Sequence, residues 1–264
     1  MKALHLTEFG RDRLRLVDTL PEPAQPSAGE VLLRFAAASL NPRDSQIING
    51  HFTPDVAFPL VPLSDGAGEV LAVGEGVTRV APGDTVTPLF FPNWISGEAL
   101  GDERKISSGL EAPGVMRELA VYPEHALARA ASHLGAAEAA CLPCAGLTAW
   151  SALVDRSGVG PGDWVLIQGT GGVATAAIQF TRALGARSIL ADPRSVESRD
   201  KVNAVIKYRE PWRPFCPSMT EDAARKYFPD YTHAPFMIMT FRANETAARE
   251  VPAVVHVDST SRPQ

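Results

Sequence analysis

The chain has 264 residues, an apolar fraction of 45% and a formal net charge of −5. These values are normal for a globular protein with room for one large domain or two ordinary ones. The acidic balance and the lack of a dense Lys/Arg cluster give no electrostatic reason to expect nucleic acid or an anionic membrane surface as a partner. No apolar run approaches the ~20 residues of a membrane span, and residues 1–5 lack the apolar stretch of a signal peptide, so we expect a cytoplasmic protein.

The first part of the chain is predicted to be rich in β-strands. Short apolar runs bounded by glycine and proline turns predict strands over residues 30–38, 68–74 and 84–90. This texture continues to about Ala126. We therefore expect a β-rich domain over residues 1–126.

After Ser132 the sequence becomes rich in alanine, which favours helices. Ser132 is a candidate N-cap for a helix through residues 135–140, and a second alanine-rich helix is expected over residues 145–154. The apolar run at 164–168 suits a buried parallel strand, and residues 173–184 carry apolar side chains at helical spacing.

A glycine turn lies between that strand and that helix. Gly169, Gly171 and Ala174 fit the fingerprint G-x-G-x-x-G/A, in which the glycines permit a tight turn and a close approach of the backbone to a pyrophosphate. The helix N-terminus beginning at Gly172 and Val173 would supply free N–H groups to the phosphates. The order strand, turn, helix favours a dinucleotide site, and a turn without a ligand is the alternative. Asp192 lies about where a ribose-binding acid would be expected, which by itself favours NADH over NADPH.

Four segments together resemble the medium-chain dehydrogenase/reductase superfamily, in its quinone-oxidoreductase-like branch. They are residues 38–44, 62–70, 74–84 and 142–150. The resemblance covers residues 1 to about 186 and implies a GroES-like catalytic domain followed by a Rossmann domain, with the active site in the cleft between them. It also implies NADPH or NADH as cofactor and a small carbonyl, alcohol or quinone as substrate, and it is compatible with a homodimer.

The resemblance is to members that work without zinc. Zinc-dependent relatives carry a cysteine where this chain has Asn41, and a His-Glu pair where it has Ser64 and Asp65. The four-cysteine structural loop of those relatives is missing as well, because residues 91–117 contain no cysteine. Cys141 and Cys144 form a lone C-x-x-C pair in an alanine-rich helix, which is more often core than metal site. We expect no metal.

Without zinc, hydride transfer depends on positioning and on hydrogen-bond donors that polarise the substrate oxygen. By resemblance, Thr148 lies near the nicotinamide, and Asn41 with Asp44 lines the cleft. The alternatives are that Thr148 is a plain helix residue and that Asn41 starts a turn before Pro42. Three aromatic residues that follow a predicted strand are candidates for a substrate-pocket wall, or else core: Phe90, Phe91 and Trp94.

A different family is resembled by the C-terminal part. Residues 182–194, 203–217 and 251–264 resemble O-carbamoyltransferases of the nodulation and antibiotic type. In that resemblance Lys207 and Arg209 match a basic pair that holds phosphate, for which their charge and geometry are suited, although a solvated charged face is the alternative. Asp192 is then better explained by this second signature than by ribose binding.

The two resemblances overlap at residues 182–187, which leads to the hypothesis of a chimaera of two shortened enzymes. The expected fold class is α/β: a GroES-like domain (1–126), a truncated Rossmann βα unit (127–186) and an α+β carbamoyltransferase-like fragment (187–264). Loss of the later Rossmann strands would leave an exposed parallel edge, low stability and an oxidoreductase that is inactive through truncation. The alternatives are a carbamoyltransferase-related fragment that works with a partner chain and a non-catalytic remnant.

Overall fold

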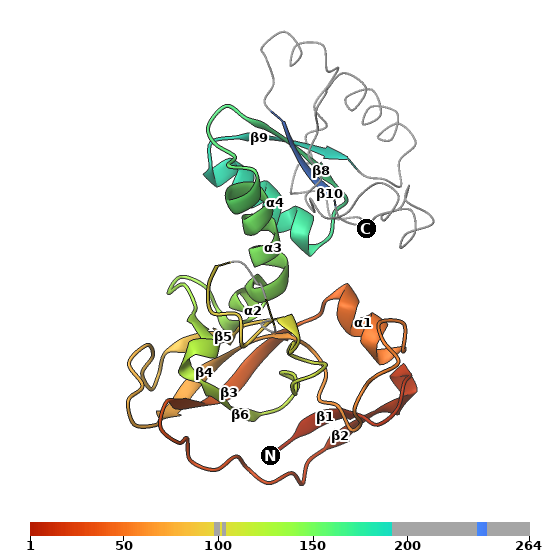
Figure 1. Ribbon diagram of the computed structural model, residues 1–264, viewed down its shortest axis with the longest axis vertical. Coiled ribbons are helices and arrows are strands. Elements are labelled where there is room, and N and C mark those ends of the chain that lie inside the picture. Colours follow the sequence, from red (N-terminus) through yellow and green to blue (C-terminus); the bar gives the residue numbers. More distant parts are fainter. Residues whose placement is uncertain (98–100, 102–103, 192–236, 242–264) are drawn as a thin grey trace, which may run out of the picture. The chain divides into compact units, whose positions relative to one another are not determined.

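The computed structural model describes residues 1–97, 101, 104–191 and 237–241 (Figure 1). The chain divides into two compact units, Met1–Ala145 and Gly146–Gln264, and each is considered by itself. The first unit extends beyond the expected domain end at residue 126, because strand β7 (Leu127–Arg129) belongs to its sheet.

A five-stranded antiparallel sheet forms the centre of the first unit. Its strands follow the order β6-β3-β4-β5-β7. The four not yet given are β3 (Glu30–Ser39), β4 (Asp65–Val73), β5 (Thr85–Pro88) and β6 (Leu119–Pro123). The 3-10 turn η3 (Glu124–Ala126) joins β6 to β7. The three strands expected from the apolar runs are present, and β4 begins three residues earlier than expected.

Alternation of side chains along these strands builds the core of the unit. Branched residues on one face of β3, β4 and β5 are fully buried, among them Val31, Leu33, Val70 and Val86. Burial of such side chains contributes about 1.5 to 3 kcal/mol each. A second cluster gathers Ile47 from helix α1 (Pro42–Ile48) with apolar residues of the surrounding segments, which fixes that helix.

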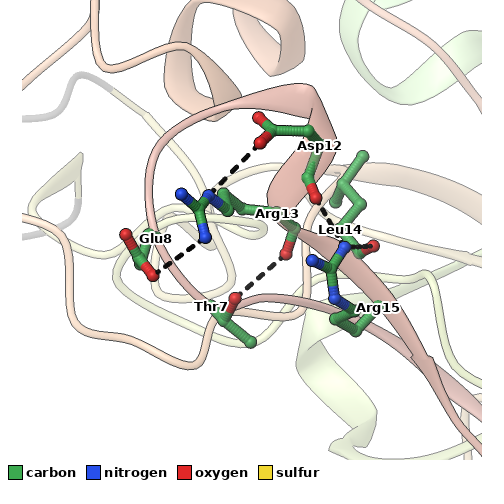
Figure 2. A network of polar contacts seen from close by, with 6 residues as sticks. All are labelled: Thr7, Glu8, Asp12, Arg13, Leu14 and Arg15. Atoms are coloured by element: carbon green, nitrogen blue, oxygen red, sulfur yellow. Dashed lines mark hydrogen bonds and ion pairs between the residues drawn. The ribbon is translucent and has the colours of Figure 1, made fainter.

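A small hairpin precedes the sheet. Strand β1 (Ala3–Leu6) pairs antiparallel with β2 (Leu14–Val17), with the 3-10 turn η1 (Arg11–Arg13) between them. Figure 2 shows Arg13, the last residue of this turn, between two acids, Glu8 at 3.5 Å and Asp12 at 3.3 Å. Its carbonyl oxygen accepts a hydrogen bond of 3.1 Å from the Thr7 hydroxyl. Because these charges are exposed, they shape the turn more than they stabilise the fold.

The prediction that Ser132 caps the next helix is wrong. Helix α2 (Ala136–Ala139) begins after Gly135, whose N–H donates to the Glu138 carboxylate at 2.9 Å. Glu138 therefore satisfies a backbone group at the helix start, and Ser132 lies in the preceding turn. The second predicted helix is longer than residues 145–154: a π-type turn η4 (Leu142–Gly146) leads into α3 (Leu147–Trp150) and a second π-type turn η5 (Ser151–Arg156).

The second unit is built around a βαβ arrangement. Strand β8 (Trp164–Gln168), helix α4 (Gly172–Ala183) and strand β9 (Arg187–Ala191) follow one another, and β8 pairs parallel with β9. Val165, Ile167, Ala174 and Ala177 are buried where α4 packs against the strands, and α3 packs against α4. The predicted strand, glycine turn and helix are confirmed.

Among the described strands, the parallel strand β9 is at the edge of this sheet, as expected, whereas β8 is not. Strand β10 (Met237–Phe241) pairs antiparallel with β8, which becomes the central strand in the order β10-β8-β9. The backbone groups on that side of β8 are therefore paired rather than open. Within the described ranges, no helix is long and apolar enough to cross a membrane.

Candidate functional site

Asn41 and Asp44 lie together at the start of α1. The Asn41 backbone N–H donates to Oδ2 of Asp44 at 2.7 Å, which closes the first turn of the helix. The Asp44 side chain is 3% exposed. Its second oxygen, Oδ1, and the amide nitrogen Nδ2 of Asn41 are both buried without a well-aligned hydrogen-bond partner in the described structure, although the Ser64 N–H lies near Asp44 and the Asp65 carboxylate lies near Asn41. Buried polar atoms of this kind are costly in a fold and are typical of ligand sites.

A second buried carboxylate lies at the start of β4. The Ser64 hydroxyl donates to Oδ1 of Asp65 at 2.7 Å, and the backbone N–H of Cys144 donates to Oδ2 at 2.9 Å. Ser64 and Asp65 are completely buried. The sequence pattern identified this pair only as the place where zinc ligands are missing. The sequence did not predict that Asp65 would hold the segment around Cys144 in place through this hydrogen bond.

The backbone before this pair is held in a strained conformation. Leu63 has a φ of 71°, in the left-handed region that few residues other than glycine adopt. Its carbonyl oxygen accepts a hydrogen bond from the Val115 N–H at 2.9 Å. Gly114 packs so closely that an added Cβ would lie 2.2 Å from the carbonyl oxygens of both Pro62 and Leu63. The surrounding chain therefore imposes the conformation that presents Ser64 and Asp65.

Burial controls the ionisation of these groups. It raises the pKa of Asp65 and of Asp44, against the lowering effect of the Ser64 hydroxyl on Asp65 and of the Asn41 backbone on Asp44. Burial, together with the charges of Asp65 and Asp44, raises the pKa of the Cys144 thiol to about 12. The thiol is therefore protonated at neutral pH and is not an activated nucleophile. Among the described residues, no group of three His, Cys, Asp or Glu side chains is placed to hold a metal ion.

Arg43 lies beside these acids and reaches into two loops. Its guanidinium donates to the Ser108 carbonyl oxygen at 3.0 Å and to the Ser107 hydroxyl. The centre of the guanidinium is 5.2 Å from the centre of the Phe52 ring and 4.8 Å from that of Phe90. Burial lowers the pKa of Arg43, and the charge of Asp44 opposes this effect.

The predicted aromatic wall continues from Phe90. The Phe90 and Phe91 rings meet edge to face at 4.7 Å, and Phe91 is 6.1 Å from Trp94. These three residues are half-buried and lie outside the two core clusters of this unit described above. They are therefore partly exposed and do not belong to those two clusters.

The glycine turn of the second unit has the geometry expected of a phosphate-binding loop. Gly169 has a φ of 94°, and Gly171 is the N-cap of α4 without a side-chain cap. Gly171 and Gly172 are exposed, so the N–H groups of the first turn of α4 are accessible. This donor set, which has no side-chain cap among the described residues, fits a pyrophosphate.

The remaining predicted cofactor residues belong to the same unit. The side chain of Val173 packs into the core of the unit, so that only its backbone N–H is left for a phosphate. Thr148 is half-buried on α3. Lys207, Arg209 and Asp192 lie outside the described residues.

Two families match different parts of the chain. The alcohol dehydrogenase GroES-like domain matches residues 27–132, and the carbamoyltransferase C-terminus matches residues 172–264. Both predicted resemblances are confirmed. The second match begins ten residues before the expected position of 182.

Individual relatives fall into the same two groups, dehydrogenases or reductases on one hand and nodulation proteins on the other. A zinc-type alcohol dehydrogenase-like protein of Schizosaccharomyces pombe is 42% identical over 166 residues, covering 62% of this chain and 48% of that protein. A chloroplast envelope quinone oxidoreductase homologue of Arabidopsis thaliana is 32% identical over 222 residues, which cover 80% of this chain and 62% of that protein. The nodulation protein NolO of Bradyrhizobium diazoefficiens is 50% identical over 86 residues, covering 31% and 16%.

Solved structures of alcohol dehydrogenases are also similar to this chain. An NAD-dependent alcohol dehydrogenase superposes with a TM-score of 0.64 at 35% identity, covering 78% of this chain and 61% of that one. The fold class is therefore confirmed. The chain spans about half of the length of the yeast relative and less than two thirds of the others.

Proposed function

We propose that this chain, through its relationship to alcohol dehydrogenases and quinone oxidoreductases, is an NAD(P)-dependent oxidoreductase acting on a small carbonyl, alcohol or quinone. The observation that carries the proposal is the glycine turn that opens α4 between two parallel strands. A GroES-like domain match at residues 27–132 precedes it in the chain.

The residues proposed for the cofactor belong to the second unit, and those proposed for the substrate belong to the first. The first-turn N–H groups of α4, at Gly172 and Val173, would hold the pyrophosphate, with Thr148 near the nicotinamide. The nicotinamide, when bound, supplies or accepts the hydride. In the first unit, Nδ2 of Asn41, which lies near the Asp65 carboxylate, would donate a hydrogen bond to the substrate oxygen.

Asp44 is the candidate group to donate or accept the proton that accompanies hydride transfer. Reduction of a carbonyl requires a proton on the oxygen, and oxidation of an alcohol releases one. Because burial raises the pKa of Asp44, its carboxyl holds a proton at higher pH than an exposed carboxyl would.

Titration of the purified full chain with NADPH and with NADH tests the proposal. We expect nicotinamide fluorescence to rise on binding, the melting temperature to increase, and slow turnover with a quinone or an aldehyde. The comparison of the two nucleotides also decides the cofactor preference. A folded sample that binds neither nucleotide would contradict the proposal and would favour a non-catalytic remnant.

The second family match supports a competing function. The carbamoyltransferase C-terminus covers residues 172–264, with 50% identity to NolO over 86 residues. On this reading Lys207 and Arg209 would hold phosphate in a site completed by a partner chain. ATP turnover that depends on carbamoyl phosphate, lost in a Lys207→Ala, Arg209→Ala variant, would favour it over the oxidoreductase.

A further inference from the structure

The Asp65 carboxylate is a point at which three segments of the first unit meet. Its Oδ1 accepts a hydrogen bond from the Ser64 hydroxyl at 2.7 Å, and its Oδ2 accepts one from the Cys144 N–H at 2.9 Å. Nδ2 of Asn41 lies near the same carboxylate. Because Asp65 is completely buried, the protein rather than water supplies its hydrogen-bond donors. The fold therefore fixes the position of this carboxylate.

The central sheet brings Asp65 and Asn41 together. Ser39, the last residue of β3, pairs with Asp65, the first residue of β4. Asn41 follows Ser39 by two residues and is the N-cap of α1, so it starts beside the end of this ladder. Its backbone is held there by the N–H that donates to Oδ2 of Asp44 at 2.7 Å. Backbone pairing thus places the two residues before either side chain is oriented.

A carboxylate beside a primary amide decides which way the amide faces. The Asn41 side chain has an oxygen that only accepts hydrogen bonds and a nitrogen, Nδ2, that only donates them. An ionised carboxylate accepts and cannot donate, so it favours the orientation with Nδ2 toward Asp65 over the one with the amide oxygen there. Both oxygens of Asp65 already accept from the protein, which suits the ionised form. Since Nδ2 carries two hydrogens, one can face Asp65 while the second is left for another acceptor.

We propose that Asp65 is a positioning residue, which holds the Asn41 amide in the orientation that leaves one N–H for the substrate oxygen. The inference rests on the proposed oxidoreductase for the use of this N–H, whereas the orientation itself needs neither cofactor nor substrate. Without Asp65, the amide is free to turn its own oxygen toward the substrate oxygen, where two acceptors repel each other. A donor aimed in advance stabilises the charge that develops on the substrate oxygen without reorganisation during the reaction.

NMR of the Asn41 side-chain amide tests the orientation in the full chain without nucleotide. In the wild type, we expect one of the two Nδ2 hydrogens to be shifted downfield and to exchange slowly with solvent, because it faces a buried carboxylate. In Asp65→Asn, which keeps the size of the side chain, both signals should move toward those of exposed asparagines. Wild-type signals that already resemble those of exposed asparagines would overturn the inference, whether or not the variant folds.

Asp84→Asn is the matched control for this measurement. It makes the same change at another carboxylate of the first unit, one that accepts the Ala81 N–H at 2.9 Å. The Asn41 signals should stay unchanged in this variant. Asn41 signals that move equally in Asp84→Asn and in Asp65→Asn would overturn the inference, because the effect would not be specific to Asp65.

Turnover tests the use of the orientation. Asn41→Ala should lower kcat about 100-fold, the order of the loss of one oxyanion donor, and Asp65→Asn should lower it about ten-fold as a part of that loss, with KM changed less than kcat. Because Asp65 acts through Asn41, the double variant should be no slower than Asn41→Ala alone. Losses that multiply in the double variant would show an independent, structural role and would overturn the inference.

The outcomes separate this inference from the proposed function. Shifted Asn41 signals that depend on Asp65, in a chain that binds neither NADPH nor NADH, support the orientation and contradict the oxidoreductase. Nucleotide binding with turnover supports the oxidoreductase, but the inference is overturned if kcat is then unchanged in Asp65→Asn or if the Asn41 signals are those of an exposed amide.

Discussion

Asp44 and Asp84 are two carboxylates of the first unit whose environments shift their ionisation in opposite directions. Asp44 is buried, and burial raises its pKa above the ordinary value of 3.8. Asp84 accepts a hydrogen bond from the Ala81 N–H at 2.9 Å and pairs with Arg129 at 3.0 Å, which lowers its pKa. Each shift makes the free energy of unfolding depend on pH.

Asp44→Asn and Asp84→Asn should therefore change the pH dependence of stability in opposite ways. The folded state binds the Asp44 proton more tightly than the unfolded state does, so stability from this group falls as the pH rises from about 4 to its raised folded pKa. Asp84 instead contributes stability above its unfolded pKa, and this is lost as the pH falls through the lowered folded pKa. Relative to the wild type, we expect Asp44→Asn to gain stability as the pH rises from 4 to 8.

Melting temperature measured against pH for the three proteins checks this prediction. Asp84→Asn should lose stability relative to the wild type over the pH range in which only the folded-state carboxylate is ionised, and above it. Parallel curves for Asp44→Asn and the wild type would mean that Asp44 is not perturbed by burial.

Gly114 is a residue whose small size the fold requires. An added Cβ would lie 2.2 Å from two carbonyl oxygens of the chain that leads to Ser64. Because backbone atoms cannot move aside easily, Gly114→Ala should cost about 2 kcal/mol of stability through overpacking. Gly135→Ala is the control, since its Cβ would meet only Glu138 at 3.7 Å, and its cost should stay below about 1 kcal/mol. Urea unfolding of both variants measures the difference, and equal midpoints would refute the close contact.

At the scale of elements, helix α4 connects local sequence to a binding function. Its 12 residues begin after an N-cap glycine that has no side-chain cap, so the first-turn N–H groups depend on water or a ligand for partners. A negative charge at this end favours the helix through the macrodipole but repels a phosphate. Stability and nucleotide binding can therefore be separated by one substitution.

Gly172→Asp should weaken NADPH binding at least about ten-fold, the effect of roughly 1.4 kcal/mol, without lowering the melting temperature. The carboxylate would occupy the position expected for the pyrophosphate while stabilising the start of α4 by about 0.3 to 1 kcal/mol. Gly172→Ser is the neutral control of similar bulk and should bind more tightly than the aspartate variant. Unchanged binding by Gly172→Asp would show that any nucleotide binds elsewhere.

Considered as a whole, the chain consists of two units with separate cores. Val31 and Leu33 belong to a cluster in the first unit, and Val165 and Ile167 to one in the second. A ligand that binds only the second unit stabilises that unit by mass action.

Calorimetry of the full chain should show two transitions. NADPH at 100 times its Kd should raise the free energy of unfolding of the second unit by about 2.7 kcal/mol. Gly114→Ala should lower the melting temperature of the first unit only. The change in Trp94 and Trp164 environments, followed by fluorescence in single-tryptophan variants, assigns each transition to a unit. A single transition shifted by both changes would contradict this division.

The chimaera hypothesis also belongs to the scale of the whole chain. The two family matches lie at residues 27–132 and 172–264, as a join of two genes predicts. The Arabidopsis relative, however, covers 80% of the chain, so its similarity runs past residue 186. Long-read sequencing across codons 180–190 decides the matter, and two separate intact genes would end the hypothesis.

The sequence by itself determined the features that depend on local periodicity and backbone freedom. Three of the five strands of the first sheet, the turn at Gly169 and the βαβ order follow from apolar spacing and from glycine, which act over a few residues. Local spacing did not decide whether Ser132 or Gly135 caps the helix, because both residue types suit a cap. The hydrogen bond from the Gly135 N–H to the Glu138 carboxylate decides it.

Only the tertiary structure decided the contacts that join distant segments. Asp65 meets the Cys144 backbone across 79 residues, and Arg43 meets Ser108 across 65. The pairing of β10 with β8 joins segments whose separation along the chain lies between those of these two pairs. Such contacts depend on how packed elements bring particular atoms within hydrogen-bond distance, and no repeat or spacing in the sequence encodes that distance.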